Sequence, residues 1–292
     1  MSQWDGKSKG TLLGYKIFVF CIKKLGIRTA YAVLIFVSLY YFLFSKTSNR
    51  YLWYYLNSRL RYSAIKSFWS MYKSYFSFGK ILIDKTAISA GLRHKFTYDF
   101  DGIHILRDLV AQKKGGVLIS AHVGNFEIAE YFLADLEFDS PINLVTTDQE
   151  HSHIKAYLNS VSQRSSIKFI IVQDDLSHIF EINNALNNNE LICFTGDRYF
   201  EGSKVMSEEL LGKKALFPSG PFLIASRLQV PVVFVYVMKE PRLHYHLYAR
   251  QATAKHRDAQ ALLKEYCHSV EDILKKYPLQ WFNYFDFWKY KG

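Results

Sequence analysis

From about residue 96 onward, short apolar runs alternate with stretches that have helical spacing. A buried strand is expected at 117–121, and further strands are expected at 142–147, 168–172, 191–197, 231–240 and 243–249. Helices are expected at 102–116, 125–136, 150–166, 176–189 and 258–278, and a turn followed by a helix at 217–229. Because parallel neighbours need crossover connections, this order predicts an α/β fold with a mostly parallel central sheet flanked by helices.

The N-terminal part of the chain contains a long uncharged run. AYAVLIFVSLYYFLF, residues 30–44, is fifteen residues long and has no charge. Its two polar neighbours extend it to the lower limit of about 17 residues for a membrane span, and the bulky YYF sequence is unlike a signal-peptide cleavage site. We expect a short membrane span or a deep interfacial helix at 29–45, with a buried core helix as the alternative. Lys and Arg flank the run on both sides, so charge does not set its orientation.

The positive charge of the chain is concentrated at its N-terminal end. The formal net charge is +11, and residues 1–80 hold 13 Lys and Arg against one acid. Over residues 50–85, aromatic and basic residues alternate at a spacing typical of amphipathic helices. Such a region suits an anionic membrane surface, and its apolar character disfavours nucleic acid as a partner; ordinary helices with a solvated basic face are the alternative. We therefore expect a membrane-associated helical region at 1–85 and an α/β domain at 86–292.

The cysteine and histidine spacings do not predict a disulfide framework or a metal centre. Cys21, Cys193 and Cys267 are odd in number and widely separated, so free thiols in a reducing compartment are expected. Two His-x-His pairs, at 151–153 and 244–246, lack further ligands at the usual spacing. We therefore expect no metal.

The segment AHVGNFE, residues 121–127, carries the main candidate chemistry. His122 follows an expected buried strand, and Glu127 lies in the first turns of the next expected helix. A carboxylate bonded to one ring nitrogen fixes the tautomer and raises the basicity of the other nitrogen, so we expect His122 as a general base and Glu127 as its orienting partner. Gly124 permits close approach by a substrate, and Asn125 suits a helix N-cap or a donor to a developing oxyanion. A satisfied surface pair is the alternative for His122 and Glu127.

The spacing of His122 and Glu127 resembles the HX4D/E motif of glycerolipid-type acyltransferases. The form HVGNFE is similar to that of the late acyltransferases of lipid A biosynthesis, the HtrB/LpxL/LpxM-like family. Three later blocks continue this resemblance in the same order: GDRYFEGSKV at 196–205, ALFPSGPFLIASRLQVPVVFVYV at 215–237 and YPLQWFNYFDFW at 277–288. With the N-terminal apolar helix, the resemblance covers most of the chain from about residue 12 to residue 288.

The resemblance implies that an acyl chain moves from an acyl carrier protein or acyl-CoA thioester to a hydroxyl or amine of a lipid acceptor. His122 would deprotonate the acceptor and Glu127 would orient it, with no covalent acyl-enzyme, no metal and no cofactor beyond the acyl donor. The family further implies a place at the bacterial inner membrane, with the active site on the cytoplasmic side.

The second block departs from the family pattern. It reads Gly196-Asp197-Arg198, where lipid A enzymes commonly have a Gly-Gln-Asp-like form. We expect Asp197 and Arg198 to contact substrate, because the guanidinium fork of Arg198 suits a phosphate; a salt bridge between Arg198 and an acid such as Asp197 is the alternative. The acceptor therefore stays open among lipid A-like, lysophospholipid-like, pigment, polyene and aminolipid molecules. A non-catalytic membrane lipid-binding protein of the same fold is the alternative from another functional class.

The FPSGP turn contributes two further candidate residues. Ser219 and Gly220 are expected to bring backbone amides and a helix N-terminus toward the site. Because this turn is not a Gly-x-Ser-x-Gly elbow, a serine hydrolase is not expected.

Overall fold

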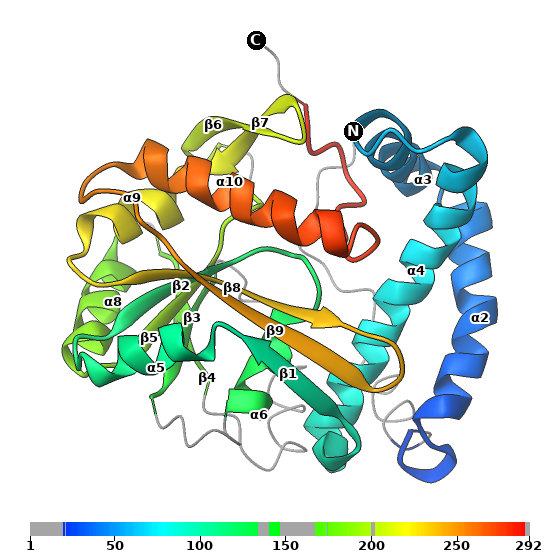
Figure 1. The fold of residues 1–292 in the computed structure, drawn as a ribbon, viewed down its shortest axis with the longest axis horizontal. Helices are drawn as coiled ribbons and strands as arrows, with labels where there is room; N and C mark the ends of the chain where they lie inside the picture. The colour runs from blue at the N-terminus through cyan, green and yellow to red at the C-terminus, as the bar shows by residue number, and fades with distance from the viewer. Residues whose placement is uncertain are drawn as a thin grey trace.

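The computed structural model describes residue 20 and residues 22–133, 140–146, 167–173, 175–199 and 202–289. Seven strands form a central sheet in the order β1-β9-β8-β2-β5-β3-β4 (Figure 1). They are β1 Thr97–Asp101, β2 Gly116–Ser120, β3 Ile142–Thr146, β4 Ile167–Ile171, β5 Leu191–Thr195, β8 Val232–Lys239 and β9 His244–Gln251. Strands β8, β2, β5, β3 and β4 are parallel, whereas β9 is antiparallel to β8 and parallel to β1. The predicted α/β fold with a mostly parallel sheet is confirmed.

Helices cover both faces of this sheet because successive side chains of each strand point to opposite sides. Val117 and Ile119 pack in the same core as residues of α8 Ser177–Asn187, α9 Ser219–Arg227 and α10 Ala259–Lys276. On the other face, Leu118 packs with residues of two further helices, α5 Ile103–Ala111 and α6 Ala129–Leu133. The core therefore lies in two layers, one on each side of the central strand β2.

Three strands were not expected from the sequence. β1 has an alternating exposed and half-buried pattern, which gives a weaker signal than the fully buried β2. β6 Val205–Leu210 and β7 Lys213–Pro218 form a separate antiparallel hairpin. Leu211 and Gly212 at its turn have φ values of 52° and 73°, a two-residue turn that matches the twist of a hairpin. In place of the turn expected at 217–221, β7 ends at Pro218 and α9 begins at Ser219. The helix expected at 150–166 lies outside the described residues.

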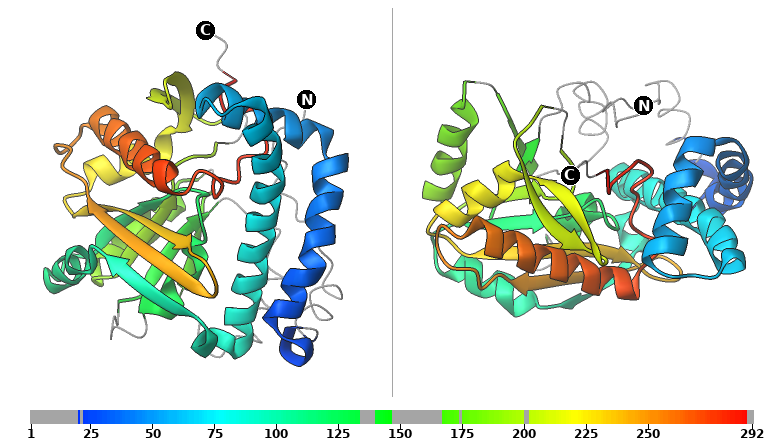
Figure 2. Two further views of the ribbon diagram at one scale, coloured as in Figure 1. Left: turned by 45° about the vertical axis from the view of Figure 1, so that its right-hand side comes forward. Right: turned by 90° about the horizontal axis from the view of Figure 1, so that it is seen from above.

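Between residue 27 and the first strand of the sheet, the chain is helical almost throughout. The elements of this region are α2 Ile27–Phe44, α3 Lys46–Trp53, the π-helical η1 Tyr54–Arg59, α4 Ala64–Ala87, the π-helical η2 Ile88–Leu92 and the 3-10 turn η3 Arg93–Lys95. α2 runs alongside α4 (Figure 2). Gly79 of α4 allows this approach, because a Cβ there would lie 2.2 Å from a methyl carbon of Leu34.

α2 coincides with the apolar run of the sequence. It has 18 residues and a mean hydropathy of 1.7, which makes it a candidate membrane span by length and composition. Only 22% of it is buried within the protein. Its exposed side chains include Val33, Phe36, Leu39 and Phe44. An apolar helix side that the protein leaves uncovered suits contact with lipid.

Candidate active site

The carboxyl ends of two neighbouring strands bring His122 and Asp197 together. β2 and β5 are parallel, with Ser120 opposite Thr195. Two residues beyond each strand end stand His122 and Asp197, 75 positions apart in the chain. The two side chains meet because the carboxyl ends of parallel strands lie at the same edge of a sheet, the usual place for sites in this fold class.

Asp197 makes three hydrogen bonds to His122, one to the imidazole and two to the backbone N–H. Its Oδ1 lies 2.7 Å from Nδ1 of His122, and the backbone N–H of His122 donates to both carboxylate oxygens at 3.1 Å. An ionised carboxylate can only accept, so this network assigns the proton to Nδ1 and leaves Nε2 as the basic nitrogen. The side chain of His122 is 28% exposed and that of Asp197 is 3% exposed. The base therefore opens toward solvent while its partner is enclosed.

The charge of Asp197 is favoured by its surroundings. Burial acts to raise the pKa of this carboxyl, but the adjacent His122, the hydrogen bonds from His122 and the charge of Arg198 outweigh it, so the pKa is lowered. Trp281 adds an Nε1–H donor 3.4 Å from Oδ2. Asp197 therefore acts as a fixed anion behind the imidazole.

Glu127 is placed differently from the sequence-based expectation. Its carboxylate is paired with Lys85 of α4 and its side chain is 44% exposed. The segment after Gly124 begins as a 3-10 turn, Phe126–Ile128, before α6 starts. That turn brings Glu127 to α4, and Nδ1 of His122 is bonded to Asp197. The structure thus gives the position of orienting partner to Asp197, and a catalytic role for Glu127 stays a prediction.

The backbone of the loop after His122 is tied to its neighbours. Gly124 has a φ of 64°, and its N–H donates to the carbonyl of Gln280 at 2.8 Å. A Cβ at Gly124 would lie 2.2 Å from the carbonyl oxygen of Val237, so the loop fits here only with glycine. Asn125 donates its backbone N–H to Val237 at 2.7 Å. The loop therefore lies directly against β8.

The side chain of Asn125 does not make the capping bond expected from the sequence, and its role as a donor to an oxyanion stays a prediction. It stands at the N-cap position of the 3-10 turn without a side-chain capping bond. Its side-chain amide instead donates to the carbonyl of Ile81 in α4 at 3.3 Å. The amide is buried and connects the loop to the N-terminal helices.

The aromatic C-terminal segment closes the site from the other side. Trp281 pairs with Val123 through an isolated β-bridge, and the N–H of Phe282 donates to the carbonyl of His122 at 3.3 Å. Gln280 makes two side-chain bonds, of 2.9 and 2.7 Å, to the backbone of Lys239. Sequence reasoning identified this segment only as a block of a family resemblance, because neither spacing nor residue type shows that it returns to the loop.

Arg198 lies beside Asp197 and its head group is held by the C-terminal segment. It donates from Nη2 to the carbonyl of Phe282 at 3.0 Å and lies 5.6 Å from the ring centre of Phe285. Burial lowers the pKa of this guanidinium, while Asp197 acts to raise it. The position next to the base is compatible with the predicted anion-binding role.

Ser219 and Gly220 begin helix α9. Ser219 is buried and its N–H donates to the carbonyl of Lys204 at 3.0 Å. Among the contacts of the described residues, none joins Ser219 or Gly220 to His122 or Asp197. Phe222, one turn further along α9, would be 3.0 Å from a Cβ at Gly196, so α9 supports the strand end that carries Asp197.

Comparison with known proteins identifies one family. The model described as bacterial lipid A biosynthesis acyltransferase matches residues 66–290. No curated protein matches the chain. The matched region holds the whole sheet, the His122–Asp197 pair and the C-terminal segment, and it begins within α4. The expected division at residues 85 and 86 stays a prediction.

Proposed function

The chain belongs to the bacterial lipid A biosynthesis acyltransferase family, and from that premise we propose that it transfers a fatty acyl chain from an acyl carrier protein or acyl-CoA thioester to a hydroxyl, or an amine, of a lipid acceptor. The proposal rests chiefly on the 2.7 Å contact between Nδ1 of His122 and the buried Asp197. That contact provides an oriented base whose other nitrogen belongs to a partly exposed ring. An acyl donor and a lipid acceptor are the partners that follow from this chemistry.

In the proposed reaction, Nε2 of His122 accepts the proton of the acceptor hydroxyl as its oxygen attacks the thioester carbonyl. The new C–O bond forms, the C–S bond breaks, and the proton passes from the imidazolium to the departing thiolate. Asp197 keeps Nδ1 protonated and stabilises the transient positive charge on the ring. The acyl donor, the acceptor and the side chains of His122 and Asp197 therefore complete the proposed step with no metal and no covalent acyl-enzyme.

Three further residues have proposed roles in binding. Arg198 would hold an anionic group of the donor or acceptor, since its planar fork suits phosphate. Gly124 and Asn125 would keep the loop close against β8, so that His122 is reached from the solvent side.

The exposed apolar side of α2 would place the protein at the cytoplasmic face of the bacterial inner membrane.

Substitution of His122 tests the proposal. H122A protein, purified in neutral detergent, should transfer acyl chains at a rate lower by at least about 100-fold, because a positioned base contributes roughly that much or more. Transfer from acyl-ACP and acyl-CoA to lipid acceptors is followed by mass spectrometry. H256A, which changes an exposed histidine, is the matched control. Undiminished transfer by H122A would overturn the base assignment, and absence of transfer by wild-type protein would favour a lipid-binding protein.

A further inference from the structure

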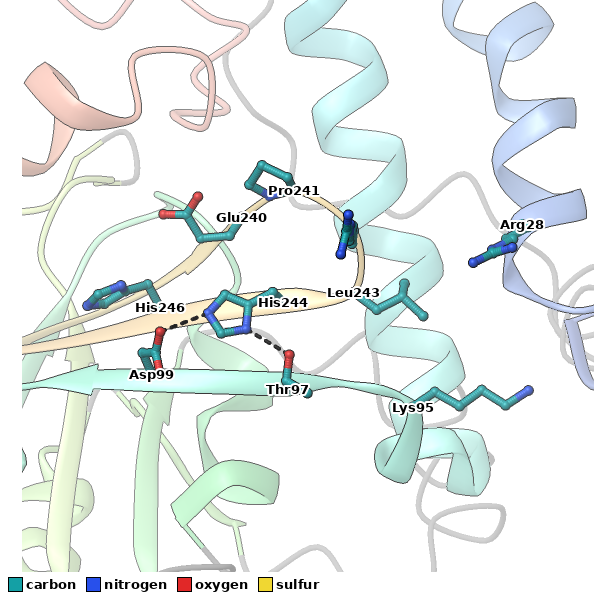
Figure 3. Close-up of a pocket in the computed structure, with 10 residues that line it drawn as sticks. Arg28, Lys95, Thr97, Asp99, Glu240, Pro241, Leu243, His244 and His246 are labelled. Carbon is teal, nitrogen blue, oxygen red and sulfur yellow. Dashed lines mark hydrogen bonds and ion pairs between the residues drawn. The ribbon is translucent and has the colours of Figure 1, made fainter.

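A cavity of about 660 Å3 lies outside the His122 site. It is bounded by the N-terminal end of α2, the beginning of β1 and the turn between β8 and β9 (Figure 3). The cavity and the His122 loop are both adjacent to β8. The backbone N–H of Asn125 donates to the carbonyl of Val237 in β8, three residues before Glu240 of the cavity wall. The cavity is within the usual size range of ligand pockets.

The lining of this cavity has an excess of positive charge. Arg28, Lys95 and Arg242 contribute three exposed cations. The two acids of the wall are already engaged: Asp99 lies 3.2 Å from Nε2 of His244, and Glu240 accepts a hydrogen bond from Tyr277. Within the described part of the chain, no ion pair involves any of these three cations. These contacts leave both acids charged, so the lining holds three cations against two carboxylates, and this excess of positive charge favours an anionic ligand.

The wall around Arg242 is held in place from the protein interior. Arg242 has a φ of 63°, in the left-handed region that few non-glycine residues adopt. Its carbonyl accepts a 2.7 Å hydrogen bond from the buried ammonium of Lys239, which is itself 2.9 Å from the buried Asp84. The position of the Arg242 backbone is therefore preset.

The imidazole of His244 is also oriented. Its Nδ1 lies 2.7 Å from the hydroxyl of Thr97 and its Nε2 faces Asp99. The ring therefore bridges β1 and β9 at the wall of the cavity (Figure 3).

The cavity stands at one end of the exposed apolar helix. Arg28 is the second residue of α2, and exposed Val33 and Phe36 follow within about two and a half turns. If the apolar side of α2 meets lipid, the three cations lie at the level where lipid phosphates are found. We propose that this cavity binds the phosphate group of a membrane lipid. This binding rests on the proposed contact of α2 with lipid, and acyl transfer plays no part in it.

Binding of a short-chain lipid tests the proposal. Dihexanoyl phosphatidic acid below its micellar concentration is titrated calorimetrically into full-length protein in neutral detergent. R28Q/K95Q/R242Q should weaken its affinity at least tenfold, because Arg and Lys are the residues that hold phosphate. R107Q/K114Q/K264Q removes the same charge from exposed sites elsewhere and should change it less than twofold. R242Q alone serves if the triple variant fails to fold.

Further titrations distinguish a lipid phosphate from a free anion and from a diffuse charge effect. Inorganic phosphate should compete only weakly; equal affinity for inorganic phosphate would replace the lipid by a free anion and overturn the proposal. Equal losses in the two triple variants would show a diffuse charge effect, and absence of binding by wild-type protein would also overturn it. H122A should bind phosphatidic acid as wild-type protein does. The binding result therefore does not depend on whether His122 is the catalytic base.

Discussion

At the residue scale, two carboxylates compete for the role of partner to His122. Asp197 is bonded to Nδ1, whereas Glu127 is paired with Lys85. D197N should lower the rate of acyl transfer by about 100-fold or more, because an amide can donate to Nδ1 and so favours the wrong tautomer. E127Q should lower it less than about tenfold, since it removes only a half-exposed surface pair. Rates are measured with saturating donor and acceptor.

The opposite ranking would contradict the geometry. If E127Q abolishes transfer and D197N leaves it intact, Glu127 is the partner, as the spacing of the sequence motif predicts. K85Q is the matched control, because it removes the partner of Glu127 and leaves Asp197 untouched.

The lowered pKa of Asp197 also predicts a pH dependence of stability. A carboxyl whose pKa is lower in the folded protein contributes stability above its ordinary value of 3.8 and loses it as the pH falls through the folded value. The Tm of wild-type protein should therefore exceed that of D197N at pH 6, and the difference should shrink below pH 4. Calorimetry of both proteins at matched pH measures it. A difference that grows toward low pH would contradict the assigned direction.

At the element scale, the contact between the His122 loop and β8 depends on a glycine. G124A should lower the free energy of unfolding by roughly 2 kcal/mol or more, since its Cβ meets a strand carbonyl and its φ is strained. G212A has a similar φ of 73° but open space around its Cβ, so roughly 1 kcal/mol of strain alone is expected. Equal effects on urea unfolding would show that the contact with Val237 is unimportant.

The elements that the sequence predicted well are those with a strong local pattern. β2 is buried at every position, so its apolar run is unmistakable, and α10 has an amphipathic spacing over 18 residues. The hairpin of β6 and β7 alternates weakly and carries charged residues such as Glu208 and Lys214, which resemble a loop. Local pattern therefore identifies an element when burial is complete or one-sided over a long run, and it fails in a short charged hairpin even though β7 buries Ala215 and Phe217.

The candidate site was predictable only in part for a related reason. His122 follows a buried strand, which is a local signal. Its partner Asp197 follows the neighbouring strand β5, and no local pattern shows that β2 and β5 are adjacent. The sequence favours Glu127 because it is close to His122 in the chain, whereas the order of strands in the sheet places Asp197 beside the imidazole.

At the scale of the whole molecule, a buried ionic cluster joins the N-terminal helices to the sheet. Asp84 of α4 is fully buried. Its carboxylate accepts hydrogen bonds from the hydroxyls of Tyr245, at 2.7 Å, and of Tyr31 in α2, and it pairs with the ammonium of Lys239 at 2.9 Å. Burial acts to raise the pKa of Asp84, and Lys239 opposes it. The helices of residues 27–87 and the α/β sheet therefore share one packed interface.

Removal of Asp84 tests this interface. D84A should lower the free energy of unfolding by about 3–5 kcal/mol, because it leaves the ammonium of Lys239 buried without its counter-charge. D272A breaks an exposed pair with Lys275 and should leave the unfolding midpoint unchanged. Chemical unfolding in neutral detergent provides both values. Similar midpoints for D84A and wild-type protein would show that the cluster contributes nothing to the interface.

The uncovered apolar side of α2 is the candidate contact of the molecule with the membrane. Phe36 is 74% exposed on this helix, and Phe180 is 78% exposed on α8, which packs with the α/β core. If α2 contacts the bilayer, F36D places a charge in lipid and should release a large part of the protein from sedimenting membranes, since a charge at the centre of a membrane helix costs about 3 kcal/mol. F180D should sediment as wild-type protein does. Equal sedimentation of both variants would show that α2 is not the membrane contact, and equal release would indicate a general effect of added charge.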